Sequence, residues 1–101
     1  MSEGTVTKLS ASDRAAMLNS LPGWEHENDH DAIRKEFVFG DFVEAFAFMT
    51  RVALAAEKMD HHPDWSNVYK TVEVRLNTHD AGGLTALDFD LAKKMDRIFG
   101  G

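Results

Sequence analysis

The sequence predicts an α+β domain in which about three helices pack on one face of an antiparallel sheet. Segments with an apolar residue every three or four positions alternate with segments in which every second residue is apolar. The resulting order is helix, strand, strand, helix, one strand or two, helix. The 101 residues suffice for one domain and leave little room for another. We therefore expect a single domain over residues 9–101, preceded by a flexible N-terminus at residues 1–8.

A short helix is expected near the N-terminus. Ser10 and Asp13 have the spacing of a capping box, in which a hydroxyl at the start of a helix accepts a hydrogen bond from the backbone three residues further on. Apolar residues continue from Ala15 to Leu18, and a Pro-Gly pair follows. We therefore expect the helix to begin after Ser10 and to end before Pro22.

Two strands are expected next, over residues 24–27 and 32–39, joined by a polar turn at residues 28–31. The second strand has one face that is more apolar than the other, with Ile33, Lys35, Phe37 and Phe39 on that face. A strand of this kind lies with its apolar face on a core and its other face in solvent. The two strands predict an antiparallel hairpin.

The central helix is expected to begin after Gly40 and to extend to about Met59. Asp41 and Glu44 form a second capping pair at its start. Both sides are apolar: one carries Phe42, Phe46, Met49, Val52, Ala53 and Ala56, and the other carries Val43, Ala47, Phe48, Leu54 and Ala55. A small domain can cover only one side of such a helix. We therefore predict a subunit interface on the second side, which makes the protein a homo-oligomer.

A strand and a helix are expected to complete the chain. Pro63 should end the central helix, because proline disfavours helical geometry at the residue before it, here His62. Residues 67–76 alternate apolar and polar side chains, which predicts one long strand closed by a Gly-Gly pair. Thr85 and Asp88 resemble a third capping pair. The apolar positions of the last helix are Leu84, Leu87, Leu91, Met95 and Ile98.

Composition argues against several classes of function. The net charge of −6 and the absence of a run of Lys or Arg argue against direct nucleic-acid binding. Because the chain has no cysteine, it has no disulfide, no thiolate nucleophile and no Cys-ligated metal. It has neither the layout of a signal peptide nor an apolar run near the roughly 20 residues that span a bilayer. We expect a cytoplasmic protein without membrane contact.

Three of the five histidines lie where predicted elements end. His61 and His62 follow Asp60 at the end of the central helix, and His79 precedes Asp80 in the turn after the long strand. Histidine transfers protons near neutral pH, because the pKa of a free imidazole is about 6.5. One histidine can therefore protonate a leaving hydroxyl while another removes a proton elsewhere, as a dehydration requires. The other two are expected at the surface, in or beside the polar turn: His26 and His30.

The residues alone leave two other interpretations open. Three histidines can hold a catalytic zinc, with Asp60 or Asp80 as a further ligand or partner, although adjacent residues such as His61 and His62 rarely converge on one ion. Alternatively, the chain is an interaction protein whose central helix pairs with a partner helix through its second apolar side. Two aromatic residues are candidates for the walls of a site that takes a flat ring: Trp65 and Tyr69.

Three segments and one later residue share a specific spacing of histidines and aromatic side chains. They are residues 57–65 (Glu-Lys-Met-Asp-His-His-Pro-Asp-Trp), 67–69 (Asn-Val-Tyr) and 78–80 (Thr-His-Asp), with Asp88 on the last helix. An aromatic residue follows the proline of the His-His-Pro sequence by six positions, and the third histidine lies ten positions beyond it. This pattern, with the order of elements over most of the chain, resembles the pterin-4a-carbinolamine dehydratases.

The resemblance implies an activity and a set of site residues. Enzymes of this family dehydrate 4a-hydroxytetrahydropterin, a by-product of aromatic amino acid hydroxylases, to the quinonoid dihydropterin without a metal or organic cofactor. By position, His61 and His79 are the acid/base pair that acts on the 4a-hydroxyl and a ring N–H, and His62 mainly binds and orients the pterin. Asp60, Asn77, Thr78 and Asp80 would line the pocket, and Glu57, Trp65 and Asp88 would have supporting roles.

The resemblance also implies partners. Members of the family form homodimers and homotetramers in which the central helices meet in a bundle, which agrees with the predicted interface. A functional link to an aromatic amino acid hydroxylase follows from the origin of the substrate. Some animal members also bind a homeodomain transcription factor as coactivators through the same helices. A coactivator-like interaction is therefore the second function to test.

Overall fold

The computed structural model describes residues 7–100, which form a four-stranded sheet, three α-helices and one short 3-10 helix. The elements are α1 Ala11–Leu18, β1 Glu25–Glu27, β2 Ala32–Val38, α2 Phe42–Met59, β3 Asp64–Val68, β4 Thr71–Leu76, η1 His79–Ala81 and α3 Ala86–Gly100. Most of the N-terminus that the sequence predicts to be flexible, residues 1–6, lies outside the described residues. Among the described helices, none combines the length and apolar character that crossing a bilayer requires.

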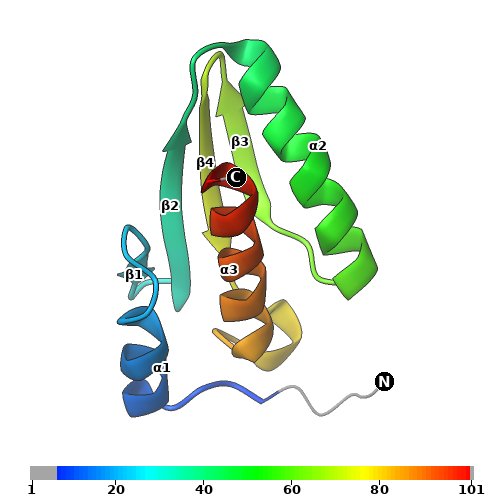
Figure 1. The fold of residues 1–101 in the computed structure, drawn as a ribbon. Helices are drawn as coiled ribbons and strands as arrows, with labels where there is room; N and C mark the ends of the chain where they lie inside the picture. The colour runs from blue at the N-terminus through cyan, green and yellow to red at the C-terminus, as the bar shows by residue number, and fades with distance from the viewer. Residues whose placement is uncertain (1–6, 101) are drawn as a thin grey trace.

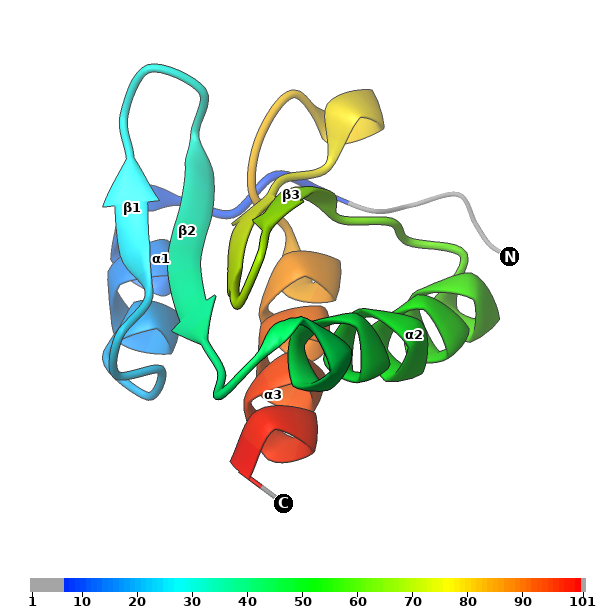
Figure 2. The same cartoon turned by 90° about the horizontal axis from the view of Figure 1, so that it is seen from above.

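The sheet is antiparallel, with the strand order β1-β2-β4-β3. Figures 1 and 2 show α2 and α3 on the same face of this sheet. The buried side chains of the two central strands point to that face and form much of the core: Ile33, Phe37, Val72, Val74 and Leu76. The opposite face carries ion pairs, such as the one between Arg34 and Glu73 at 2.8 Å. The α+β prediction is confirmed.

The single long strand predicted over residues 67–76 is wrong, because two strands occupy this region. β3 and β4 pair through a two-residue turn at Tyr69 and Lys70, and Tyr69 adopts a φ of 50°. The side-chain amide of Asn67 donates hydrogen bonds to the carbonyls of Tyr69 and Thr71, at 3.1 and 3.0 Å, and so stabilises the reversal. Neither glycine nor proline marks this turn, so the alternation of side chains continues through it unbroken.

The ends of α2 are fixed by local hydrogen bonds. The Asp41 carboxylate accepts from the backbone N–H of Glu44 at 2.9 Å, and the Glu44 carboxylate accepts from the backbone N–H of Gly40 at 2.9 Å, which confirms the predicted cap. At the other end Asp60 takes a left-handed conformation with φ 54° and closes the helix. The helix therefore ends at Met59, as the sequence predicts, and the backbone leaves helical geometry at Asp60, before the His62-Pro63 stop.

The two sides of α2 differ from the predicted ones. Ala45, Phe48, Val52 and Ala56 are buried, so Phe48, predicted on the outward side, lies in the core. Its ring centroid lies 4.7 Å from that of Phe37 and 5.0 Å from that of Phe39. Conversely, two residues of the predicted inward stripe are about half exposed, Phe42 at 47% and Phe46 at 55%. Aromatic packing sets the rotation of the helix, which a sequence apolar on both sides does not reveal.

The other two helices begin at predicted caps. The Ser10 hydroxyl accepts from the backbone N–H of Asp13 at 3.1 Å at the start of α1. At the start of α3 the Asp88 carboxylate accepts from the backbone N–H of Thr85 at 2.9 Å. Both bonds satisfy backbone donors that a helix start leaves free. Two of the buried apolar side chains of α3, Leu91 and Met95, belong to the predicted pattern. The pattern missed two others, Phe89 and Ala92.

Candidate active site

His61 and Asp88 form a buried pair. Nε2 of His61 lies 2.6 Å from Oδ1 of Asp88, although the two residues are 27 positions apart. His61 is 8% exposed and Asp88 is fully buried. The left-handed Asp60 turns the chain at the end of α2, and the backbone N–H of His61 donates to the carbonyl of Ala56 at 3.1 Å. The end of α2 therefore directs His61 toward the first turn of α3.

The second carboxylate oxygen of Asp88 accepts two more hydrogen bonds. Oδ2 receives the backbone N–H of Thr85 and the hydroxyl of Thr78, each at 2.9 Å. The hydroxyls of Thr78 and Thr85 lie 2.8 Å apart. Because the Thr78 hydroxyl donates its hydrogen to Asp88, the Thr85 hydroxyl donates to Thr78. We call these four buried residues, His61, Thr78, Thr85 and Asp88, the Asp88 network.

His79 lies on a loop that leaves this network. The backbone N–H of Thr78 donates to the carbonyl of Gly83 at 2.9 Å, and the N–H of Gly83 donates back at 3.3 Å, closing the loop around η1. His79 and Asp80 are exposed on it. Figure 1 shows this loop and the C-terminal end of α2 at the same end of the molecule. Within the described residues, His61 and His79 share no hydrogen bond, and the link between them runs through Thr78 and Asp88.

His62 is oriented differently from its neighbour. Its Nε2 lies 2.9 Å from Oε1 of Glu57, and the two side chains are 58% and 81% exposed. An ion pair as exposed as this contributes little to stability. Asp60 is also exposed. The sequence places two histidines side by side, and the structure buries one against a carboxylate while it leaves the other in solvent.

The remaining predicted residues lie in three different settings. Trp65 is half-buried and packs against the core. The side-chain amide of Asn77 donates to the carbonyl of His30 at 3.4 Å, which ties it to the turn between β1 and β2. Tyr69 is 62% exposed in the turn between β3 and β4, at the opposite end of the molecule from the end of α2 (Figure 1). Trp65 and Tyr69 therefore do not form two walls of one site.

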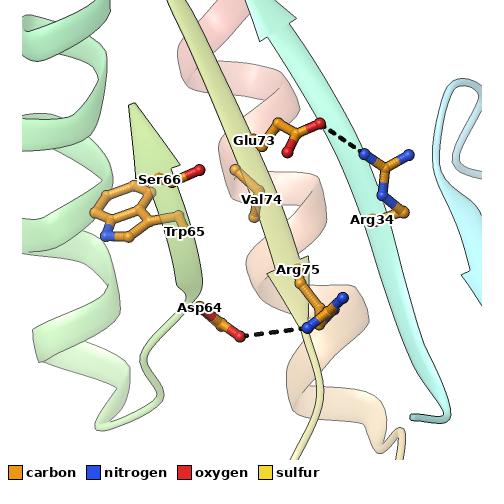
Figure 3. A pocket seen from close by; sticks show the side chains of 7 residues that line it. All are labelled: Arg34, Asp64, Trp65, Ser66, Glu73, Val74 and Arg75. Atoms are coloured by element: carbon orange, nitrogen blue, oxygen red, sulfur yellow. Dashed lines mark hydrogen bonds and ion pairs between the residues drawn. The ribbon is translucent and has the colours of Figure 1, made fainter. Parts of the chain in front are cut away.

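One hollow of the surface lies outside the Asp88 network. A shallow pocket of about 170 Å³ is lined by Arg34, Asp64, Trp65, Ser66, Glu73, Val74 and Arg75, as Figure 3 shows. Ion pairs surround it, Arg34 with Glu73 at 2.8 Å and Arg75 with Asp64 at 3.7 Å, and it contains none of the three candidate histidines.

Within residues 7–100, no three His, Asp or Glu side chains are arranged to hold a metal ion.

Comparison with known families decides the assignment. The family model described as "Pterin 4 alpha carbinolamine dehydratase" matches residues 7–98, a span that includes the Asp88 network, His62 and His79. The chain belongs to the pterin-4a-carbinolamine dehydratase family.

Individual relatives of this chain carry the name of the same family. A protein of Mesorhizobium japonicum named "Putative pterin-4-alpha-carbinolamine dehydratase" is 66% identical over 97 residues, which cover 96% of this chain and 99% of the relative. A protein of Dinoroseobacter shibae with the same name is 63% identical over 93 residues, covering 90% of this chain and 96% of the relative.

Solved structures show the same fold. The crystal structure of a transcriptional coactivator/pterin dehydratase from Brucella melitensis superimposes with a TM-score of 0.91 at 45% identity, covering 93% of this chain and all of that one. A pterin dehydratase-like protein identified as a RuBisCO assembly factor in the alpha-carboxysome gives a TM-score of 0.67 at 21% identity, over 78% of this chain and 92% of the other. The second similarity shows the fold alone.

In this dehydratase-family chain, each predicted supporting carboxylate contacts a histidine: Asp88 contacts His61 and Glu57 contacts His62. Thr85, by contrast, was not predicted as a site residue. Its capping relationship with Asp88 is the signal that points to it, because the N–H bond that caps α3 also orients the Asp88 carboxylate toward His61.

Proposed function

We propose that this protein is a dehydratase that converts 4a-hydroxytetrahydropterin to the quinonoid dihydropterin and water. Membership of the family and the names of the relatives support the reaction. The observation that carries the proposal is the buried contact of 2.6 Å between Nε2 of His61 and Oδ1 of Asp88. A histidine held by a carboxylate partner is a recurrent arrangement for moving protons during catalysis.

The reaction needs two proton transfers. The C4a–O bond breaks as the hydroxyl accepts a proton and leaves as water. A ring N–H loses its proton, and the electron pair of that bond forms the new C=N bond. One histidine of the pair His61 and His79 gives the first proton and the other takes the second, so the protein gains no net proton. No electron leaves or enters the pterin, so the step needs no redox cofactor.

Asp88 determines which nitrogen of His61 takes part. As a carboxylate it only accepts hydrogen bonds, so Nε2 of His61 carries the hydrogen in their contact. Nδ1 is then the nitrogen that exchanges a proton with the pterin. The negative charge of Asp88 stabilises the imidazolium that exists while Nδ1 is protonated. Thr78 and Thr85 orient the carboxylate through the bonds to Oδ2.

Pterin binding is assigned to polar residues next to this pair. The amino group and ring N–H groups of a pterin are donors, which carboxylate, amide and carbonyl oxygens accept. His62, oriented by Glu57 at 2.9 Å, contacts the ring from the end of α2. The rest of the set is carried by the end of α2 and the η1 loop: Asp60, Asn77, Thr78 and Asp80.

The test generates 4a-hydroxytetrahydropterin in situ and follows its spectral decay with and without metal-stripped protein. Acceleration that does not depend on metal supports the proposal, and a decay no faster than background contradicts it. His61→Ala and His79→Ala are each expected to lower kcat/KM by about 100-fold or more. His30→Ala is the matched control, because this exposed histidine lies in the turn between β1 and β2. Full activity in both site variants would contradict the acid/base assignment.

A second candidate function rests on the outward side of α2. Four large apolar side chains there are 47–73% exposed: Phe42, Val43, Phe46 and Leu54. An apolar surface of this kind favours self-association or a partner helix. The relative from Brucella melitensis is described as both a transcriptional coactivator and a pterin dehydratase. We therefore propose a homo-oligomer formed through α2, and the two functions are compatible in one chain.

A further inference from the structure

We propose that Asp31 is a positioning residue that holds the loop carrying Thr78 and His79 in the geometry the reaction needs. This inference rests on the dehydratase activity proposed above. It begins from the turn between β1 and β2, where Asp31 takes a left-handed conformation with φ 44°. That conformation is uncommon outside glycine, and an aspartate tolerates it better than most residues.

The Asp31 carboxylate joins four separate segments of the chain. Oδ1 lies 2.7 Å from Nε2 of His26 on β1 and 3.5 Å from a guanidinium nitrogen of Arg14 on α1. Oδ2 accepts the backbone N–H of Leu84 at 3.2 Å and lies 3.9 Å from Nζ of Lys8. The side chain is only 15% exposed. The ion pair with Lys8, whose side chain is 52% exposed, contributes little. The bond to Leu84 is the contact that reaches the site.

The carboxylate also packs directly against the η1 loop. A side chain at Gly83 would overlap Oδ2 of Asp31, so the close approach requires glycine there. Gly83 exchanges backbone hydrogen bonds with Thr78 at 2.9 and 3.3 Å. The backbone carbonyl of Leu84 accepts from the N–H of Leu9 at 2.8 Å, so Leu84 is held on both sides. Asp31 thus fixes the backbone at Gly83, which pairs with Thr78.

The position of Thr78 affects both histidines. The Thr78 hydroxyl donates to Asp88 at 2.9 Å, and Asp88 holds His61. His79 is the next residue after Thr78 and begins η1. A shift of the loop therefore moves His79 and also changes the hydrogen bonding of the carboxylate on which His61 depends. Misplacement of reacting groups by about 1 Å can cost up to roughly 100-fold in rate.

The electrostatic setting keeps Asp31 able to accept these bonds. Burial raises the pKa of this carboxyl, but the hydrogen bonds from His26 and Leu84 and the charges of His26 and Lys8 outweigh burial and lower the pKa below its ordinary value. The group is therefore a carboxylate at neutral pH. Both oxygens of the carboxylate accept hydrogen bonds, as the contacts with β1 and with the loop require.

The experiment compares Asp31→Ala and Asp31→Asn with the matched control Glu27→Ala. Glu27 lies in the same hairpin and bonds Arg75 at 2.6 Å on the outer face of the sheet, away from the η1 loop. We expect Asp31→Ala to lower kcat by about tenfold with a change in KM of less than about threefold. Asp31→Asn keeps one oxygen acceptor and should retain an intermediate kcat, whereas Glu27→Ala should match the parent.

A second readout does not need activity. The backbone amide of Leu84 should lose hydrogen-exchange protection in Asp31→Ala, and the amide NMR shifts of Thr78 and His79 should change with it, while Glu27→Ala leaves all three unchanged. A merely structural role would lower stability and leave kcat of the folded protein near the parent value. Folded Asp31→Ala with kcat within about twofold of the parent would overturn the proposal.

The two proposals fail separately. If the parent protein does not accelerate dehydration, the dehydratase proposal fails, and the NMR shifts alone decide whether Asp31 positions the loop. Shifts confined to residues next to positions 31 and 84 would then overturn the positioning role. If Asp31→Ala does not fold, the loop is approached from the other side. Gly83→Ala would bring a methyl group into Oδ2 of Asp31, so it should displace the loop and lower kcat, and a kcat within about twofold of the parent would overturn the proposal.

Discussion

Nε2 of His61 lies 2.6 Å from Oδ1 of Asp88, and this buried contact joins the end of α2 to the first turn of α3. The same carboxylate caps α3 through the backbone of Thr85. One side chain therefore stabilises a helix start and holds a histidine. Variants of Asp88 and its partners separate these two roles.

Asp88→Asn should remove most of the activity and leave the fold in place. The amide has the shape of the carboxylate, but one of its polar atoms becomes a donor, so it cannot accept from His61 and from both threonines at once. We expect kcat to fall by about 100-fold or more, as in other enzymes where a carboxylate that orients a histidine is replaced. Asp90→Asn, an exposed change on the same helix, is the control. Activity of Asp88→Asn within about fivefold of the parent would contradict the role of the pair.

Thr78→Val should destabilise the protein. The valine matches threonine in shape but leaves the hydroxyl of Thr85 and one lone pair of Asp88 without their buried partner. We expect the free energy of unfolding to fall by about 1–3 kcal/mol. Thr78→Ser, which keeps the hydroxyl, should stay close to the parent. Urea unfolding followed by circular dichroism measures the stability of both variants, and the exposed change Thr50→Val is the control. Equal stability of Thr78→Val and Thr78→Ser would show that the hydrogen bonds of the Thr78 hydroxyl contribute nothing to stability.

Phe48→Ala tests the rotation of α2. Phe48 is 2% exposed and packs on the rings of Phe37 and Phe39. Truncation of a buried phenylalanine costs about 3–5 kcal/mol of unfolding free energy. Phe46→Ala, at a site 55% exposed, should cost much less in the isolated subunit. If Phe48 faced outward, as the sequence pattern predicts, the two costs would be reversed in a urea titration at low protein concentration.

The elements that could be predicted from the sequence are those fixed by neighbouring residues. The two residues of each capping pair are three positions apart, and each pair forms a capping bond; at α3 this bond runs from the Thr85 N–H to the Asp88 carboxylate, in the direction opposite to the other two. The rotation of α2 is different, because apolar residues on both sides leave the choice to the ring of Phe37 on β2. The turn at Tyr69 was missed because it contains no glycine or proline and depends on the side chain of Asn67.

The candidate site could be predicted only in part. The resemblance to a family gives His61, His62 and His79 by spacing alone. It does not give the bond between Asp31 and Leu84, whose residues are 53 positions apart, or the chain from Thr85 through Thr78 to Asp88. Contacts of this kind depend on the fold that brings the segments together, so they are visible only in the structure.

Leu54→Glu should change the oligomeric state without changing the site. Leu54 is 69% exposed on the outward side of α2, so a carboxylate there meets solvent in the isolated subunit and an apolar surface in an assembly. We expect light scattering to show a smaller assembly than for the parent, with the circular dichroism spectrum of the fold retained. Lys58→Gln, an exposed change near the end of the same helix, lowers the net charge by the same one unit and controls for it. An unchanged mass would place the interface elsewhere.

The pH dependence of stability should contain a contribution from Asp31. Burial raises the pKa of its carboxyl, but hydrogen bonds from His26 and Leu84 outweigh burial and leave the folded pKa below the ordinary value of 3.8. A carboxyl with a lower pKa in the folded chain binds protons more weakly there than in the unfolded chain. Its stabilisation is therefore fully present above the unfolded pKa and is lost as the pH falls through the folded pKa.

Urea unfolding of the parent and of Asp31→Asn at a series of pH values measures this contribution. The difference in unfolding free energy should shrink as the pH falls below about 4, since protonated Asp31 and asparagine are both neutral. Charges that do not contact Asp31 affect both proteins and largely cancel in the difference. If the difference stays the same down to about pH 2.5, the charge of Asp31 does not stabilise the fold, and the hydrogen bond to the backbone of Leu84 acts through its geometry alone.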